Sequence, residues 1–166
     1  MHAKLLQFFF RYRAPECLLT DGYYSYKMDM WGVGCVFFEI VALFPLFPGA
    51  NETDQLQKIH AVLGTPAPEI LAKFRHRSDH SVPAPSAART GTGIATLIPH
   101  CSSTCIDLVE KLLYYDPEER LSARQALKHP YFKDLRCVPL EQDFAFFLSF
   151  STAALCQGCR NSIFGD

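Results

Sequence analysis

The sequence has no excess of charge of either sign and no hydrophobic run long enough to cross a membrane. Its 16 Lys and Arg residues against 17 Asp and Glu residues give a formal net charge of −1, which offers no electrostatic basis for binding nucleic acid or an acidic membrane surface. A membrane-spanning helix needs about 20 consecutive apolar residues. The apolar start at residues 1–10 lacks the small-residue cleavage site of a secretory signal. We therefore expect no nucleic acid and no membrane among the partners.

A disulfide framework is not indicated either. The seven cysteines are odd in number and irregularly spaced, whereas small secreted scaffolds carry paired cysteines in regular patterns. Cys156-x-x-Cys159 resembles half of a zinc site, but no second Cys or His pair lies at a suitable spacing. We expect free thiols, no disulfide-linked partner, no metal site, and an intracellular location in the cytoplasm, the nucleus or both.

Strand and hairpin patterns are absent, whereas helical patterns recur, so the predicted fold class is mainly α. From Asp29 to about Leu43 the only other charge is Glu39, and apolar residues occur on every face. This pattern predicts a helix that is buried all round, with two adjacent buried strands as the alternative. Asp29 is predicted as its N-cap, because a carboxylate there accepts backbone N–H groups and faces the positive end of the helix dipole.

Shorter helices are predicted farther along the chain. Asn51 and Asp54 form a box-like capping pattern for a helix that ends at Gly64-Thr65-Pro66. Residues 66–99 contain five prolines and are expected to form a long loop with one helical turn around residues 69–74. Two further helices are expected, one capped by Ser102 or Ser103 and ended by Asp116-Pro117, the other capped by Ser122 with Gln125 and ended by His129-Pro130.

Four separated segments match a known family in order and at plausible spacing. They are Tyr12-Arg13-Ala14-Pro15-Glu16, Asp29-Met30-Trp31-Gly32-Val33-Gly34-Cys35, Pro45 to Gly49 with Gly64-Thr65-Pro66, and Asp116-Pro117-Glu118-Glu119-Arg120 with Ala126 to Phe132. Together they resemble the large C-terminal lobe of protein kinases. Tyr-Arg before Ala-Pro-Glu, Gly-Thr-Pro and the Pro-rich insert resemble the CMGC group, which contains the mitogen-activated and cyclin-dependent kinases, and within it the relatives of male germ cell-associated kinase.

The resemblance implies three segments: a non-family extension at 1–10, a partial kinase lobe at 11–136 with the group's insert at about 66–99, and a non-family apolar tail at 137–166. The sequence contains no Gly-x-Gly-x-x-Gly, His-Arg-Asp or Asp-Phe-Gly, which phosphoryl transfer in this family requires. We expect a lobe without the N-lobe, the catalytic loop or the magnesium-binding loop. No catalytic, cofactor-binding or metal-binding residue is predicted, although the intact family uses ATP and Mg²⁺.

The resemblance also implies roles for particular residues. Glu16 and Arg120 are expected to form a buried ion pair, for which the planar guanidinium of arginine is suited. Trp31 is expected to be a structural residue of the core. Asp29 corresponds to the family aspartate that holds the catalytic loop, which leaves N-capping as its role in this chain.

Tyr12 and Arg13 correspond to residues that position the substrate in the intact family. The helix that covers one side of the central helix in that family is also missing, so an exposed apolar groove is expected there. Three functions remain open. The chain is an inactive partial Ser/Thr kinase domain, a module that binds protein partners through residues 51–99, or a non-functional truncated product that chaperones and proteases clear.

Overall fold

The computed structural model describes residues 10–20, 25–76 and 88–133. The chain divides into two compact units, Met1–Tyr131 and Phe132–Asp166, and the fold described here is that of the first. All regular elements in the described ranges are helical, which confirms the prediction of a mainly α protein. None of these helices has the length and apolar character that crossing a bilayer requires. The elements are α2 (Pro15–Leu19), α3 (Tyr26–Ala42), α4 (Glu52–Leu63), α5 (Pro68–Arg75), α6 (Ile94–Leu97), α7 (Ser103–Leu112), α8 (Ala123–Leu127) and the short 3-10 helix η1 (Pro130–Phe132).

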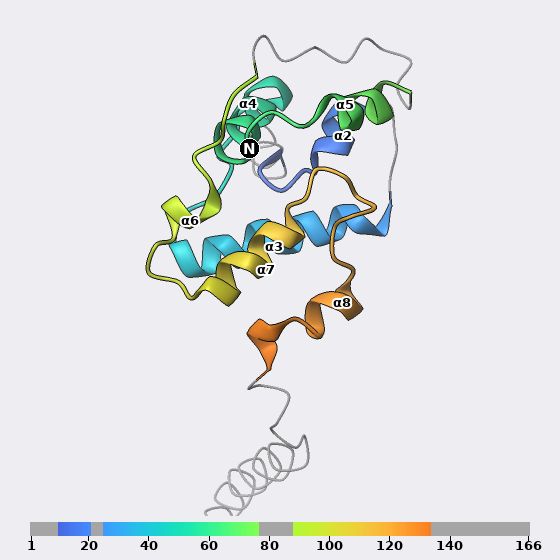
Figure 1. Ribbon diagram of the computed structural model, residues 1–166. Helices are drawn as coiled ribbons and strands as arrows, with labels where there is room; N and C mark the ends of the chain where they lie inside the picture. The colour runs from blue at the N-terminus through green and yellow to red at the C-terminus, as the bar shows by residue number, and fades with distance from the viewer. Residues whose placement is uncertain (1–9, 21–24, 77–87, 134–166) are drawn as a thin grey trace, which may run out of the picture. The chain divides into compact units, whose positions relative to one another are not determined.

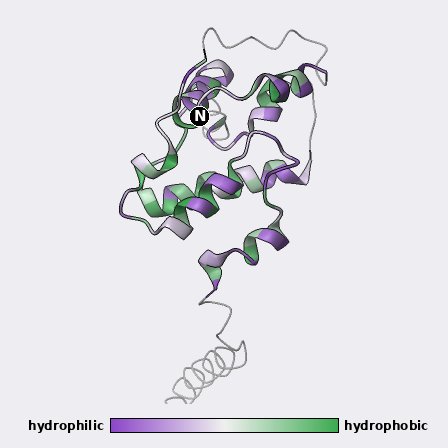
Figure 2. Ribbon diagram, in the orientation of Figure 1, coloured by the Kyte–Doolittle hydropathy of each residue, from purple (hydrophilic) through white to green (hydrophobic). Residues whose placement is uncertain are grey.

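The centre of the fold is the packing of α3 against α7, which lie side by side in Figure 1. Hydrophobic residues concentrate along the later part of α3 (Figure 2). Gly34 lies where the two helices meet, and a Cβ on it would come 2.9 Å from Leu113 Cδ2 and 3.0 Å from Leu112 Cβ. Glycine therefore permits the close approach. The main core cluster consists of Ala14, Trp31, Cys35, Phe38, Leu46, Phe47, Ile59, Ile94, Ile98, Val109 and Leu113.

Helix α3 begins one turn earlier than predicted, and Asp29 is not its N-cap. The cap is Ser25, whose backbone is extended and whose Oγ accepts a hydrogen bond from the backbone N–H of Lys27 at 3.3 Å. Asp29 lies inside the first turn and is exposed. Its carboxylate still faces the positive end of the helix dipole. The prediction failed because Tyr26, Lys27 and Met28, which follow Ser25, are too few to show the apolar pattern of a helix.

The prediction that α3 is buried all round is wrong. One face is buried and includes Trp31, Gly34, Cys35 and Phe38, and Phe37 beside it packs against the ring of Tyr131 in η1. The opposite face exposes three apolar side chains, with exposed fractions of 49% for Val33, 45% for Val36 and 66% for Ile40. This exposure agrees with the uncovered apolar face that the kinase resemblance implied.

The predicted start and end of α4 are confirmed. Asn51 Oδ1 accepts a hydrogen bond from the backbone N–H of Asp54 at 2.9 Å, and Asp54 Oδ2 accepts one from the N–H of Ala50 at 2.9 Å. In a capping box Asp54 would accept from the N–H of the N-cap Asn51, whereas here it accepts from the N–H of the preceding residue, Ala50. Gly64 ends the helix with φ 83°, a conformation that glycine adopts without strain.

Residues 66–99 contain more helix than predicted. The expected single turn is the eight-residue α5, with Pro68 in its first turn. Helix α6 was not predicted, because a four-residue helix between prolines has too few positions to show a period. Ile94 and Ile98 anchor it in the core, with exposed fractions of 1% and 0%.

The capping patterns of the last two helices are confirmed. Ser102 Oγ accepts a hydrogen bond from the N–H of Cys105 at 3.2 Å and begins α7. Ser122 and Gln125 form the reciprocal capping box of α8. The predicted apolar tail at 137–166 lies outside the described residues.

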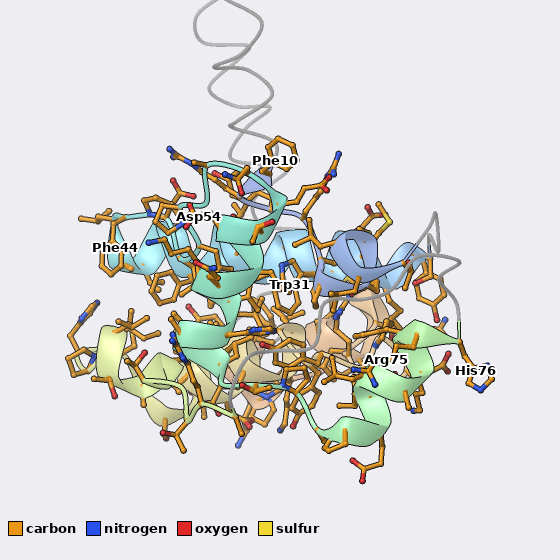
Figure 3. All side chains as sticks on the ribbon, turned by 90° about the horizontal axis from the view of Figure 1, so that it is seen from above. Phe10, Trp31, Phe44, Asp54, Arg75 and His76 are labelled. Carbon is orange, nitrogen blue, oxygen red and sulfur yellow. The ribbon has the colours of Figure 1, made fainter. Side chains whose placement is uncertain are left out.

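Trp31 lies at the centre of the core, as Figure 3 shows, whereas Phe10, Arg75 and His76 lie at its edge. Its indole stacks on Phe47 with ring centroids 5.7 Å apart and an interplanar angle of 17°. The ring of Tyr115 lies 6.5 Å away at an angle of 51°. The Arg120 guanidinium lies over the indole, 5.2 Å from the ring centroid. Trp31 therefore joins the helical core to the Arg120 site described next.

Candidate functional site

The segment Tyr12-Arg13-Ala14-Pro15-Glu16, which resembles a kinase motif, leads into α2 and forms its first turn. Ala14 is extended (φ −71°, ψ 149°), as expected before a proline, and Pro15 begins α2. The helix itself was not predicted, since five residues carry no periodic pattern. Its first turn contains Glu16, whose side chain is buried.

Glu16 and Arg120 form a bidentate buried ion pair. Arg120 Nη1 donates to Glu16 Oε1 at 2.7 Å and Nη2 donates to Oε2 at 2.9 Å, and both side chains are fully buried. The predicted partners are therefore in contact, although they stand 104 positions apart in the chain. Two parallel charge-assisted hydrogen bonds of this kind fix both the distance and the orientation of the partners.

Arg120 also satisfies backbone carbonyl groups around the pair. Its Nε and Nη2 donate to the carbonyl of Tyr114 at 3.1 and 3.0 Å, and Nη1 donates to the carbonyl of Lys27 at 2.7 Å. The Lys27 ammonium in turn donates to the carbonyl of Arg120. One guanidinium thus ties α2, the start of α3 and the loop after α7 together.

Tyr12, one of the two predicted substrate-positioning residues, is bound to α3. Its hydroxyl donates to Glu39 Oε2 at 2.8 Å. Partial burial, and then the hydrogen bond and the charge of Glu39, raise the pKa of this phenol above its usual range. Tyr12 therefore stays protonated at neutral pH and acts as a donor.

Arg13, the second, lies at the surface. Its Nη1 donates to Glu52 Oε1 at 2.9 Å, and the two side chains are 44% and 60% exposed. Its guanidinium also lies over the Phe10 ring, 4.8 Å from the centroid. The arginine is therefore held at the N-terminal end of α4 without being buried.

Gln55 is a site residue that the sequence reasoning missed. It is fully buried, its Oε1 accepts from the N–H of Gly49 at 3.0 Å, and its Nε2 donates to the carbonyl of Arg11 at 3.2 Å. A Cβ at Gly49 would lie 2.2 Å from Gln55 Oε1. The amide thus connects α4 to the segment before Tyr12. Its position four residues before Ile59, on the buried face of α4, was the available signal.

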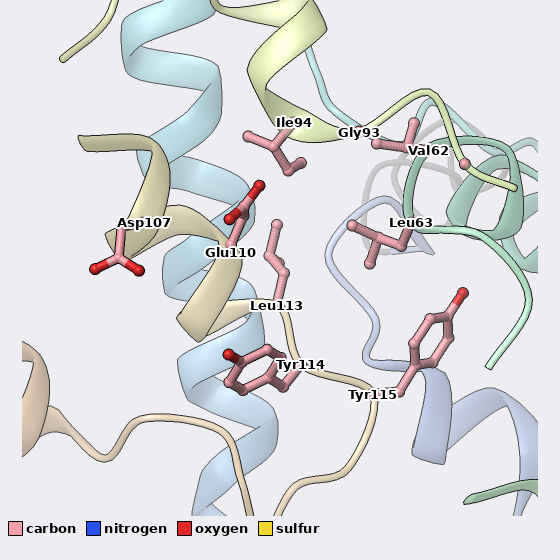
Figure 4. A pocket seen from close by; sticks show the side chains of 10 residues that line it. Val62, Leu63, Gly93, Ile94, Asp107, Glu110, Leu113, Tyr114 and Tyr115 are labelled. Atoms are coloured by element: carbon pink, nitrogen blue, oxygen red, sulfur yellow. The ribbon is translucent and has the colours of Figure 1, made fainter. Parts of the chain in front are cut away.

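A pocket lies between the end of α4, the segment around α6, and α7 (Figure 4). Its volume is about 300 Å³. Tyr115 forms one wall, and its hydroxyl donates to the carbonyl of Gly64 at 2.7 Å. The lining residues are Val62, Leu63, Gly91, Gly93, Ile94, Asp107, Glu110, Leu113, Tyr114 and Tyr115.

The described residues hold no group of three or more His, Cys, Asp or Glu side chains that would suit a metal ion. Cys156 and Cys159 lie outside these residues. Lys73 of α5 pairs with the Asp116 carboxylate, and this hydrogen bond and the charge of Asp116 raise the pKa of Lys73. Burial raises the pKa of the Cys35 thiol and raises that of Cys17 to about 11, so neither is a thiolate at neutral pH.

The amino-acid sequence matches a protein family and two of its members along most of its length. Residues 6–132 match the family described as "Protein kinase domain". Over 125 residues, 75% of its length, the chain is 54% identical to human (Homo sapiens) "MAPK/MAK/MRK overlapping kinase". The mouse (Mus musculus) protein of the same name is 53% identical over 122 residues, 74% of the chain. In both cases the match covers 29% of the relative's length.

Proposed function

Because this chain belongs to the protein kinase family, we propose that it supplies the substrate-facing, non-catalytic part of a CMGC Ser/Thr kinase lobe and does not transfer phosphate by itself. The observation that carries the proposal is the arrangement of Tyr12, Arg13 and Glu16. Three contacts, to Glu39, Glu52 and Arg120, hold this segment on the helices with Arg13 at the surface. The proposed lobe boundaries, residues 11 and 136, remain a prediction.

The absence of catalytic activity follows from what phosphoryl transfer requires. The reaction needs groups that hold the nucleotide phosphates and Mg²⁺ and that orient the acceptor hydroxyl. The 166-residue sequence contains none of the family motifs that provide them. Tyr12 and Arg13 correspond to residues that position a peptide in the intact family, and we propose no general base or metal ligand among them.

The test is a phosphoryl-transfer assay on the purified 166-residue chain. With radiolabelled ATP, Mg²⁺ and a peptide that contains serine followed by proline, we expect incorporation at background level. We also expect no shift of the melting temperature on adding ATP and Mg²⁺. The full-length human relative serves as the positive control. Phosphate incorporation that co-purifies with the chain, together with saturable ATP binding, would contradict the proposal.

A second function is supported by the pocket of Figure 4. We propose that residues 51–99, with α7, bind a protein partner. The pocket opens to solvent and its lining is largely apolar with two carboxylates, which is the composition typical of specific binding sites. It contains none of Tyr12, Arg13 and Glu16, and it adjoins the Arg120 site at Tyr114, whose carbonyl accepts from Arg120.

The partner function is tested with a displayed library of random peptides. Immobilised chain is expected to retain peptides that bind saturably. These peptides should slow amide hydrogen exchange at residues 60–64 and 91–97 and leave exchange in α8 unchanged. If no peptide is retained, or if protection appears only outside the pocket, the partner function is wrong.

A further inference from the structure

We propose that the pocket between α4 and α7 binds a lysine side chain of the partner, with its aliphatic part against the apolar wall and its ammonium on Glu110. This inference rests on the proposed partner-binding function and gives it a chemical class. The pocket volume of about 300 Å³ accommodates one long side chain and leaves its head in contact with solvent.

The apolar wall consists of side chains from three segments that are distant in sequence. Val62 and Leu63 come from the end of α4, Ile94 from α6 and Leu113 from the end of α7, and all four face the same space in Figure 4. Val62 and Leu63 are half-buried, and they are the parts of this wall that a ligand can still cover. A chain of methylene groups is the ligand chemistry that gains from such a wall.

The two carboxylates of the pocket differ in what they already bind. Asp107 Oδ2 accepts from Lys111 Nζ at 2.7 Å and lies 2.8 Å from His129 Nε2. The contact with Lys111, supported by that with His129, lowers the pKa of Asp107. Figure 4 shows Asp107 on the far side of α7 from Leu63. The charge of Asp107 is therefore directed to residues of the chain itself.

Glu110 is placed differently. Its carboxylate lies beside Ile94 and Leu113 in Figure 4, at the edge of the apolar wall. Glu110 is exposed, and its carboxylate has no hydrogen bond or ion pair with any other residue of the described part of the chain, although its backbone carbonyl accepts from the N–H of Leu113 at 3.1 Å. A cation whose stem lies on the wall would reach this carboxylate, whereas the Glu110 charge would repel an anion.

Hydrogen-bond capacity favours lysine over arginine. The carbonyl of Val62 accepts from the N–H of Gly93 at 2.9 Å, that of Ala61 accepts from Thr92 at 3.0 Å, and that of Gly64 accepts from Tyr115 Oη. These three carbonyls already accept from the chain, and the Glu110 carboxylate is the acceptor that we assign to the ligand. A guanidinium has five donors in a fixed fork, whereas an ammonium needs one partner here and directs its other donors to solvent.

The experiment titrates the full chain with n-butylammonium, which has the chemistry of the lysine side chain, and with neutral n-butanol. Methyl NMR signals of Val62, Leu63, Ile94 and Leu113 are followed. We expect saturable shifts with both probes and an affinity for n-butylammonium about two to five times higher, the ratio typical of an exposed ion pair. Higher salt should reduce that ratio.

Glu110→Gln is the diagnostic variant, and it should make the two affinities equal. The matched control is Glu69→Gln, which changes an exposed glutamate of α5 outside the pocket and should leave the ratio unchanged. The inference is overturned if n-butylammonium does not shift these methyl signals saturably, or if the ratio survives in Glu110→Gln.

The two proposals can fail separately. If displayed peptides protect the pocket from hydrogen exchange but n-butylammonium does not bind, the lysine inference is wrong and the partner function stands. If n-butylammonium binds through Glu110 but no peptide is retained, the lysine chemistry is supported and the partner function fails.

Discussion

Replacing Glu16 with glutamine is expected to lower the free energy of unfolding by about 3–5 kcal/mol, the usual cost of removing one partner of a buried ion pair. The variant keeps the size of the side chain but leaves the Arg120 charge buried without its counterion. The carbonyls of Tyr114 and Lys27 still accept from Arg120, and they compensate a full positive charge only in part. Urea unfolding followed by Trp31 fluorescence measures the change.

The exposed pair of Arg13 and Glu52 provides the matched control. Glu52→Gln also removes a carboxylate from an arginine at 2.9 Å, but both side chains are substantially exposed. An exposed pair contributes about 0–1 kcal/mol, so this variant should unfold near the wild-type midpoint. If Glu16→Gln proves as stable as Glu52→Gln, the pair is not a structural anchor of the fold.

Replacing Trp31 with alanine is expected to lower the free energy of unfolding by about 3–5 kcal/mol, as for other fully buried aromatic residues. The side chain is completely buried, and its removal leaves Phe47 without its stacking partner. It also removes the ring beneath the Arg120 guanidinium. Since the fluorescence of Trp31 is lost in this variant, far-ultraviolet circular dichroism in urea is the appropriate measurement.

Two further variants separate this effect from a change in helix propensity. Val33→Ala lies on the exposed face of α3 and should change stability by less than about 0.5 kcal/mol. Trp31→Phe should cost less than Trp31→Ala, because it keeps a ring and removes an indole N–H that has no acceptor among the described residues. Equal effects of Val33→Ala and Trp31→Ala would contradict the central role of Trp31.

The helical fold was predictable where a local pattern determines it. The caps at Asn51 and Ser122 depend on side chains within three or four residues of the helix start, so the sequence alone identified them. The start of α3 was misplaced because the apolar pattern of this helix becomes recognisable only after Asp29, three residues after Tyr26, where the helix begins. The exposure of Val33, Val36 and Ile40 was not visible in the residues themselves, because burial depends on what packs against a helix.

Some residues of the candidate site could also be predicted from the sequence, whereas their partners could not. Tyr12, Arg13, Glu16 and Arg120 were found through a family pattern, and the structure brings Glu16 and Arg120 together. Their other partners were missed. Glutamate is usually exposed, so nothing in the sequence marks Glu39 or Glu52. They contact Tyr12 and Arg13 only when the helices pack. No local pattern encodes contacts across 27 and 39 positions.

The separation of 104 positions between Glu16 and Arg120 has a consequence for the order of synthesis. A ribosome adds about 5–20 residues per second, so Arg120, the counterion of Glu16, is made roughly 5–20 s after Glu16. During that time α2 has no buried partner for its carboxylate. We therefore expect the Glu16 carboxylate to stay hydrated until nearly all of the helical unit has been translated.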